Sequence, residues 1–389
     1  MNTKLATLLV LLSTFNLLVF AQDASKYEIG TRCAEEVNVE KIFGSQAMYF
    51  TVPSKSDEPT LDLWIADNSG TNFSGLSFQD FDLLEANPSG NYVMVASRQY
   101  EYGSERGIFD FQGSIFSEYR LVDMTDLSIE ILLLPPKLYE IQFMSSITWV
   151  DDTRAAFISI QNQVIAILDV LTQKVELLEW PEDVYLPYPS GYLSLSPDGS
   201  HILHTISTPS ITDADENPDT FLAWRIVEMD GNLELGYVDG IGNTARWMPD
   251  SSGIIVSDRD NHILQIDLQG EITTIIEEIA EYVLVNPLVN NNGTYIAFTG
   301  FSRNGNLQSL IILDRDNHQL VDSCQEAIQI EKGLWSPNGN IIAFRLGNRG
   351  NTQIALLDVE SNQVSYILPY QPKNDSIGAG YIKIIGWKK

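Results

Sequence analysis

The chain has 389 residues, of which 52 are acidic and 23 are basic, so its formal net charge is −29. Hydrophobic residues make up 44% and charged residues 19%, a composition that can bury a core and is not that of a disordered chain. The excess of acid argues against binding to nucleic acid or to anionic lipid, because both depend on clustered Lys and Arg. The acidic residues are spread along the chain, which favours solubility.

The first residues have the pattern of a secretory signal peptide. Lys4 is followed by a charge-free apolar run from Leu5 to Phe20, and Ala21 ends a small-x-small cleavage site. The alternative is a membrane anchor, but the run is shorter than the roughly 20 residues needed to span a bilayer. We therefore predict a signal peptide over residues 1–21, an exported chain (secreted, periplasmic or at the cell surface), and no membrane span after cleavage.

A turn motif recurs along the rest of the chain, each time before a strand-like apolar run. Proline presets the first corner of a tight turn, Asp or Asn hydrogen-bonds its own backbone, and Gly accepts a positive φ. The copies begin at Asn87-Pro88-Ser89-Gly90, Asp151-Asp152, Ser196-Pro197-Asp198-Gly199, Met248-Pro249-Asp250, Asn290-Asn291-Asn292-Gly293 and Ser336-Pro337-Asn338-Gly339.

A second motif is an apolar run that ends in an acidic residue. The final acids are Asp67, Asp123, Asp169, Glu228, Asp267, Asp314 and Asp358, and they recur at intervals of roughly 48 residues. Another strand-like run follows each acid. The repeating unit is therefore predicted to be a four-stranded antiparallel meander, which is the size of one propeller blade.

The repeats predict an all-β chain: a seven-bladed β-propeller over residues 46–389, preceded by an N-terminal arm over residues 22–45. The turn motif occurs six times and the acid-ended run seven times, because no such turn precedes the strand Ala47–Val52. The C-terminal run Tyr381–Trp387 resembles the missing inner strand, so we expect it to close the ring through the first blade. Six or eight blades are the alternatives.

The turns Ser196-Pro197-Asp198-Gly199 and Ser336-Pro337-Asn338-Gly339, the second with a preceding Trp335, resemble the repeat of the TolB-like and wider WD40-like (PD40-type) β-propeller family. The resemblance covers nearly all of the chain after the signal peptide. Two turns depart from it, because Asp151-Asp152-Thr153 lacks Pro and Gly, and Asn290–Gly293 lacks Pro. The family includes binding scaffolds and the propeller portions of peptidases, so the resemblance implies an architecture and not an activity.

Two connections between the second and third strands of their blades are long, and both should emerge on the same face of the ring. One, Arg98–Glu118, is rich in aromatic residues and is predicted to form a recognition surface, with self-packing of the loop as the alternative. Its candidate binding residues are Tyr100, Tyr102, Arg106, Phe109 and Phe111.

The other long connection, Ser207–Thr220, is acidic. Its oxygen-bearing side chains at alternate positions resemble the first half of a calcium-binding loop. The candidate ligands of Ca²⁺ are Asp213, Asp215, Asn217 and Asp219. Pro218 stands where such loops carry Gly, and Trp224 where they carry a bidentate acid, so a solvated acidic loop is the alternative.

The mature chain would keep two cysteines, Cys33 and Cys324. Export to an oxidising compartment and their even number predict one disulfide between the arm and the outer strand of the sixth blade, with two buried free thiols as the alternative. Acceptor motifs for N-glycosylation occur at Asn72, Asn292 and Asn374, and they have meaning only in a eukaryotic secretory pathway.

No Gly-x-Ser-x-Gly elbow is present, and the repeats leave no room for a hydrolase domain beside the propeller. We therefore expect an exported, monomeric and non-enzymatic propeller that serves as a scaffold binding a protein or a small-molecule ligand, with no catalytic residues and no cofactor apart from the candidate Ca²⁺. The alternative is a propeller enzyme of the lyase or glycosidase type that uses the central funnel.

Overall fold

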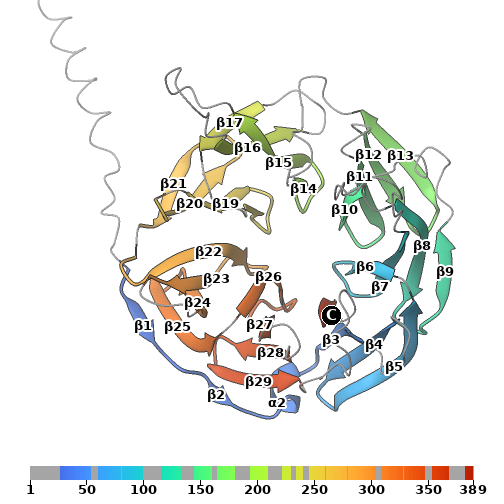
Figure 1. The fold of residues 1–389 in the computed structure, drawn as a ribbon, viewed down its shortest axis with the longest axis horizontal. Helices are drawn as coiled ribbons and strands as arrows, with labels where there is room; N and C mark the ends of the chain where they lie inside the picture. Colours follow the sequence, from blue (N-terminus) through green and yellow to red (C-terminus); the bar gives the residue numbers. More distant parts are fainter. Residues whose placement is uncertain are drawn as a thin grey trace, which may run out of the picture.

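The computed structural model describes residues 27–53, 60–79, 81–99, 115–132, 144–159, 164–179, 193–208, 221–228, 234–239, 245–258, 260–277, 279–303, 308–326, 328–346, 353–367 and 382–388. Their strands form small antiparallel sheets that stand around a central axis as a ring (Figure 1). The predicted all-β propeller is confirmed. The predicted signal peptide lies outside the described residues.

The described strands form seven sheets, and in each sheet the first-named strand is the inner one. The sheet that holds both the first and the last propeller strand contains β30 (Lys383–Lys388), β3 (Ala47–Pro53), β4 (Thr60–Asp67) and β5 (Gly70–Gln79). The next two are β6 (Phe81–Ala86), β7 (Tyr92–Gln99), β8 (Ile115–Asp123) and β9 (Ile129–Leu132), then β10 (Met144–Trp149), β11 (Arg154–Ser159), β12 (Val164–Asp169) and β13 (Lys174–Glu179).

The remaining sheets continue in chain order. Two of them are β14 (Leu193–Leu195), β15 (His201–Thr208), β16 (Phe221–Glu228) and β17 (Glu234–Asp239), then β18 (Arg246–Trp247), β19 (Gly253–Ser257), β20 (Ile263–Asp267) and β21 (Ile272–Ile276). The last two contain β22 (Tyr282–Val289), β23 (Tyr295–Ser302), β24 (Gln308–Asp314) and β25 (Gln319–Glu326), then β26 (Ile328–Trp335), β27 (Ile341–Leu346), β28 (Gln353–Asp358) and β29 (Gln363–Ile367).

The N-terminal arm runs along the outside of the last two sheets (Figure 1). Its strands β1 (Ile29–Thr31) and β2 (Glu35–Glu36) pair in parallel with β25 and β29 as fifth strands, and the single turn α2 (Glu40–Phe43) follows. Cys33, between the two strands, is bonded to Cys324 of β25 with 4.9 Å between their Cα atoms. The predicted disulfide is confirmed, while the division at residue 46 stays a prediction.

The Ser-Pro-Asp-Gly turn is held by its own side chains. In the copy that begins at Ser196, the Ser196 hydroxyl donates to Asp198 Oδ1 at 2.6 Å and accepts from the His201 amide at 2.9 Å. Burial alone would raise the pKa of Asp198, but hydrogen bonds from Ser196, Ser200 and Ser251 outweigh it and lower the pKa to about 2. Asp198 is therefore ionised at neutral pH, and Ser251 links this turn to the turn of the next sheet.

In every sheet, the acid-ended motif coincides with the end of the third strand, counted from the inner strand. β4, β8, β12, β16, β20, β24 and β28 each end at the acid identified from the sequence. In six of them the acid is Asp, and its Oδ1 accepts a main-chain N–H of the turn that follows, from Ser69, Thr125, Leu171, Gln269, Asn317 and Glu360 respectively. Because an Asp side chain can satisfy amides that the ladder leaves unpaired, the motif marks the point where a strand turns back.

Tryptophans join neighbouring sheets near the central axis. Each stands at or near the end of an inner strand, and its indole N–H donates to a main-chain oxygen of the preceding inner strand. The four pairs are Trp149 to Glu85 at 3.2 Å, Trp247 to Ser194 at 3.4 Å, Trp335 to Leu288 at 2.9 Å and Trp387 to Leu334 at 3.3 Å. The indoles therefore fill the seams between sheets and also connect them.

Two predicted boundaries need correction. Strand pairing continues past Arg98 and starts again at Ile115, so the connection between β7 and β8 is residues 100–114 rather than Arg98–Glu118. Likewise β15 continues to Thr208, and the following connection is residues 209–220. Among the described residues, none of the helices is both long and apolar enough to cross a membrane.

Candidate functional site

One end of the ring carries the connections between second and third strands, because strand direction alternates within each meander. At this end β7 ends at Gln99, β8 begins at Ile115, β15 ends at Thr208, β16 begins at Phe221, and the turn from Asp258 to His262 joins β19 to β20. The sequence-predicted binding and metal residues belong to the segments 100–114 and 209–220. Tyr100, Tyr102, Arg106, Phe109, Phe111, Asp213, Asp215, Asn217 and Asp219 all lie outside the described residues.

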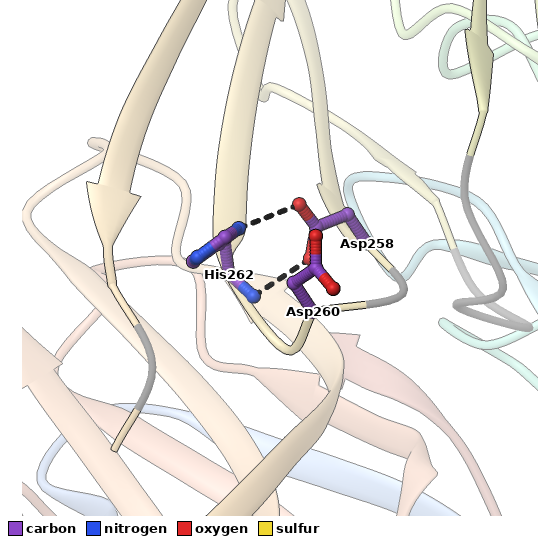
Figure 2. Close-up of side chains that lie close together, drawn as sticks. All are labelled: Asp258, Asp260 and His262. Atoms are coloured by element: carbon purple, nitrogen blue, oxygen red, sulfur yellow. Dashed lines mark hydrogen bonds and ion pairs between the residues drawn. The ribbon is translucent and has the colours of Figure 1, made fainter.

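The Asp258–His262 turn brings together three side chains whose nitrogen or oxygen atoms could bind a metal (Figure 2). Asp258 Oδ1 accepts the main-chain N–H of His262 at 2.8 Å, and Asp258 Oδ2 lies 2.7 Å from His262 Nδ1. The Asp258 amide also donates to the His262 carbonyl at 3.0 Å. The turn is thus closed by main-chain and side-chain contacts between the same two residues.

Asp260 stands at the tip of the turn and is exposed, whereas Asp258 and His262 are partly buried. One ligand atom from each of the three lies within 4.8 Å of the others. Figure 2 shows the second ring nitrogen of His262 pointing away from both carboxylates. A set of one imidazole and two carboxylates suits a transition metal better than Ca²⁺, which prefers oxygen ligands alone. Without an ion, Asp258 and His262 stabilise the turn through their hydrogen bonds.

A second chemically notable group lies on an inner strand. Glu85 of β6 pairs in register with Met94, which is fully buried, so both side chains lie on the face that packs against the next sheet. Burial raises the pKa of Glu85 to about 8. The carboxyl group is therefore largely protonated at neutral pH, at a position close to the central axis.

The sequence analysis missed both groups. In the first, Asp258, Asp260 and His262 occur at alternate positions, and that spacing on a hairpin tip was a usable signal. Glu85 gave no such signal, because its burial depends on Trp149 and other residues far away in the chain.

No protein-family model matches the chain, and no curated protein sequence matches it. Solved structures do. A candidate 6-phosphogluconolactonase from Bacteroides uniformis is 10% identical with a TM-score of 0.51, over 88% of this chain and 98% of that one. An oligogalacturonate lyase in complex with manganese is 9% identical with a TM-score of 0.50, over 83% and 85%. TolB from Acinetobacter baumannii is 14% identical with a TM-score of 0.48, over 85% and 80%.

The two similarities with TM-scores of 0.50 and 0.51 confirm that the resemblance to propeller proteins, inferred from the turn motifs, holds for the fold. At such low identity they show the fold alone, since unrelated functions share this architecture.

Proposed function

We propose that the chain is an exported, non-enzymatic β-propeller that binds a partner through the end of the ring carrying the connections between second and third strands. The observation that carries the proposal is the Asp258–His262 turn. It presents an exposed tip on a turn held by hydrogen bonds, at the same end of the ring as the strand ends Gln99, Ile115, Thr208 and Phe221. Binding residues are commonly placed on loops that a rigid scaffold positions.

Export is supported by the bond between Cys33 and Cys324, because structural disulfides form and persist in oxidising compartments. The signal-peptide pattern at residues 1–21 agrees with it. A rigid scaffold is supported by the seven sheets and by the pairing of β30 with β3, which favour a seven-bladed ring closed by the C-terminal strand. A closed ring leaves few strand edges for unwanted pairing.

Site-specific photo-crosslinking in producing cells tests the proposal. A photoreactive amino acid at position 260 should give a covalent adduct of discrete mass, because this exposed position would lie at the bound surface. The matched control position is Glu176, which is exposed on the outer strand β13, away from this end of the ring. Replacing residues 101–113 with a Gly-Ser linker should reduce the yield of the adduct from position 260.

Adducts at position 176 but not at position 260 would overturn the proposal. So would an adduct at position 260 whose yield is unchanged after the loop replacement. The linker variant should stay folded, since changing the length of a connection between two strands costs little free energy.

Glu85 favours a second candidate function, an enzyme of the lyase or glycosidase type that uses the central funnel. A carboxyl group that stays protonated at neutral pH is what a general acid requires. Native protein would then degrade a member of a panel of acidic and neutral polysaccharides, and Glu85→Gln would lose that activity without any fall in its thermal unfolding midpoint. A native chain inactive on the whole panel would count against this candidate.

A further inference from the structure

The N-terminal arm covers the outer edges of two blades, where β1 pairs with β25 and β2 pairs with β29. Ile29 of β1 lies in register with Leu320 of β25, and Glu36 of β2 lies in register with Val364 of β29. Leu320 is 2% exposed and Val364 is 1% exposed. Both are the second residue of their outer strand, and each pairs with the residue just before the acid that ends the third strand.

The same register position is open on two blades to which the arm does not extend. In β9 it is Ile129, which pairs with Val122 just before Asp123 and is 42% exposed. In β21 it is Ile272, which pairs with Ile266 and is 56% exposed. Aliphatic side chains therefore occupy an equivalent position on all four blades, and they are buried only on the two that carry a fifth strand.

The edge of β9 has a second exposed apolar residue. Ile131 points to the same face as Ile129, because side chains alternate along a strand, and it is 53% exposed. Among the described residues, none pairs with the outer edge of β9. Main-chain donors and acceptors on such an edge, next to an apolar stripe, are what an added strand uses.

The charges around this edge indicate the composition of the added strand. Glu130 lies between the two isoleucines and is exposed, and Asp126 stands exposed in the turn before β9. A hydrogen bond from the Ser128 side chain is the largest of the effects that lower the pKa of Asp126, so this group is anionic at neutral pH. The net charge of −29 also disfavours a second acidic copy of the chain as the occupant.

We propose that the outer edge of β9 binds an extended segment of a basic partner protein as a fifth strand, in the way that β1 covers β25. The partner segment has apolar residues at alternate positions, which cover Ile129 and Ile131, and Lys or Arg between them, which face Glu130 and Asp126. Main-chain hydrogen bonds supply affinity, and the two isoleucines fix the register. This surface lies on the rim of the ring, so it does not depend on the function proposed for the loops.

A twelve-residue synthetic peptide in which Val alternates with Lys and Thr is the probe. Fluorescence anisotropy measures its binding to the purified full chain at low ionic strength, and hydrogen exchange reports protection of residues 129–132. Ile131→Asp should weaken binding by about tenfold or more, since it removes apolar contact and adds a charge within it. Because Ile131 is exposed, this variant should keep the native thermal unfolding midpoint.

The matched control is Ile272→Asp on β21, which also replaces an exposed isoleucine by Asp on an edge that the arm does not cover. It should leave the affinity unchanged. Equal weakening by both substitutions, or protection that does not include residues 129–132, overturns the proposal. Self-association of the native chain that Ile131→Asp abolishes would make a second copy the occupant and overturn it as well. A peptide in which the Lys residues are replaced by Glu should bind more weakly, and equal binding contradicts the basic partner.

Discussion

A Cβ atom added to Gly90 would lie 1.9 Å from the main-chain oxygen of Trp387. Gly90 belongs to the first copy of the turn motif, and Trp387 belongs to the C-terminal strand β30, so this contact packs the second sheet against the strand that completes the first. The φ of Gly90 is also positive, at 71°. Glycine is required here for two independent reasons, its conformation and the space it leaves.

Gly90→Ala should therefore lower the free energy of unfolding by more than conformational strain alone, which is about 1 kcal/mol. Gly270→Ala is the matched control, because Gly270 has a φ of 81° and nothing within 4 Å of an added Cβ. Denaturant unfolding of both variants measures the difference. Equal losses in the two variants would show that the close approach to Trp387 has no energetic weight.

Trp387 should be central to stability. Its indole is buried, packs 5.8 Å from the ring of Phe43 and donates to the Leu334 oxygen. Trp387→Ala should cost about 3–5 kcal/mol through the cavity it leaves, and Trp387→Phe about 1 kcal/mol beyond the change in packing, through the lost hydrogen bond. Thermal unfolding of the two variants compares the cost of the cavity with the cost of the lost hydrogen bond. Native-like stability after deletion of residues 380–389 would contradict the role given to β30.

The Cys33–Cys324 bond should stabilise the folded chain, because it closes a loop with a sequence separation of 291 residues. The chain-entropy model gives about 4–5 kcal/mol for a loop of this length. Dithiothreitol should lower the thermal unfolding midpoint of the native chain. The double variant Cys33→Ser/Cys324→Ser should start from the lower midpoint and not respond, and a response from it would point to an effect of the reductant elsewhere.

Glu85 should make stability depend on pH. Burial raises its pKa in the folded state from about 4.5 to about 8, so the unfolded carboxyl loses its proton before the folded one does. The contribution of Glu85 is fully present below pH 4.5 and is lost as pH rises towards 8, at about 1.4 kcal/mol for each pH unit within that window. The free energy of unfolding, measured in denaturant from pH 5 to pH 9, should show this fall.

Glu85→Gln should remove that part of the pH dependence, because an amide does not titrate. The control Glu176→Gln changes an exposed side chain and should keep the native profile. A Glu85→Gln profile that overlays the native one would mean that other groups cause the fall.

The stability of the Asp258–His262 turn should depend on the carboxylate of Asp258 and not on that of Asp260. Asp258→Ala removes the acceptor of the His262 amide and of its ring N–H, and should cost about 1 kcal/mol. Asp260→Ala should cost close to nothing, because Asp260 is exposed at the tip. Chemical denaturation compares the two, and equal effects would contradict a stabilising role for the Asp258 hydrogen bonds.

The fold class could be read from the sequence because its signals are local. A strand that ends at Asp358, for example, does so because that side chain hydrogen-bonds the next turn, whatever the rest of the chain does. The Cys33–Cys324 bond could be inferred because only two cysteines were available. The strand ends and the disulfide could both be predicted because each depends on only a few residues.

Other features depend on contacts between distant segments. The arm strand β2 has only two residues and no apolar alternation, so its pairing with β29 has no signature of its own. Strand β8 begins at Ile115 because it pairs with Gln99, although the aromatic residues there suggested a loop. The burial of Glu85 likewise arises only when β10 packs beside β6.

The pairing of β3 with β30 also affects how the chain can fold during synthesis. The two strands are roughly 330 residues apart, and ribosomes add about 5–20 residues each second, so β3 waits on the order of tens of seconds for its neighbour. Throughout that interval the inner edge of β3 can pair with other nascent chains. The synthesis of β30 therefore determines when the inner edge of β3 is no longer exposed to aggregation.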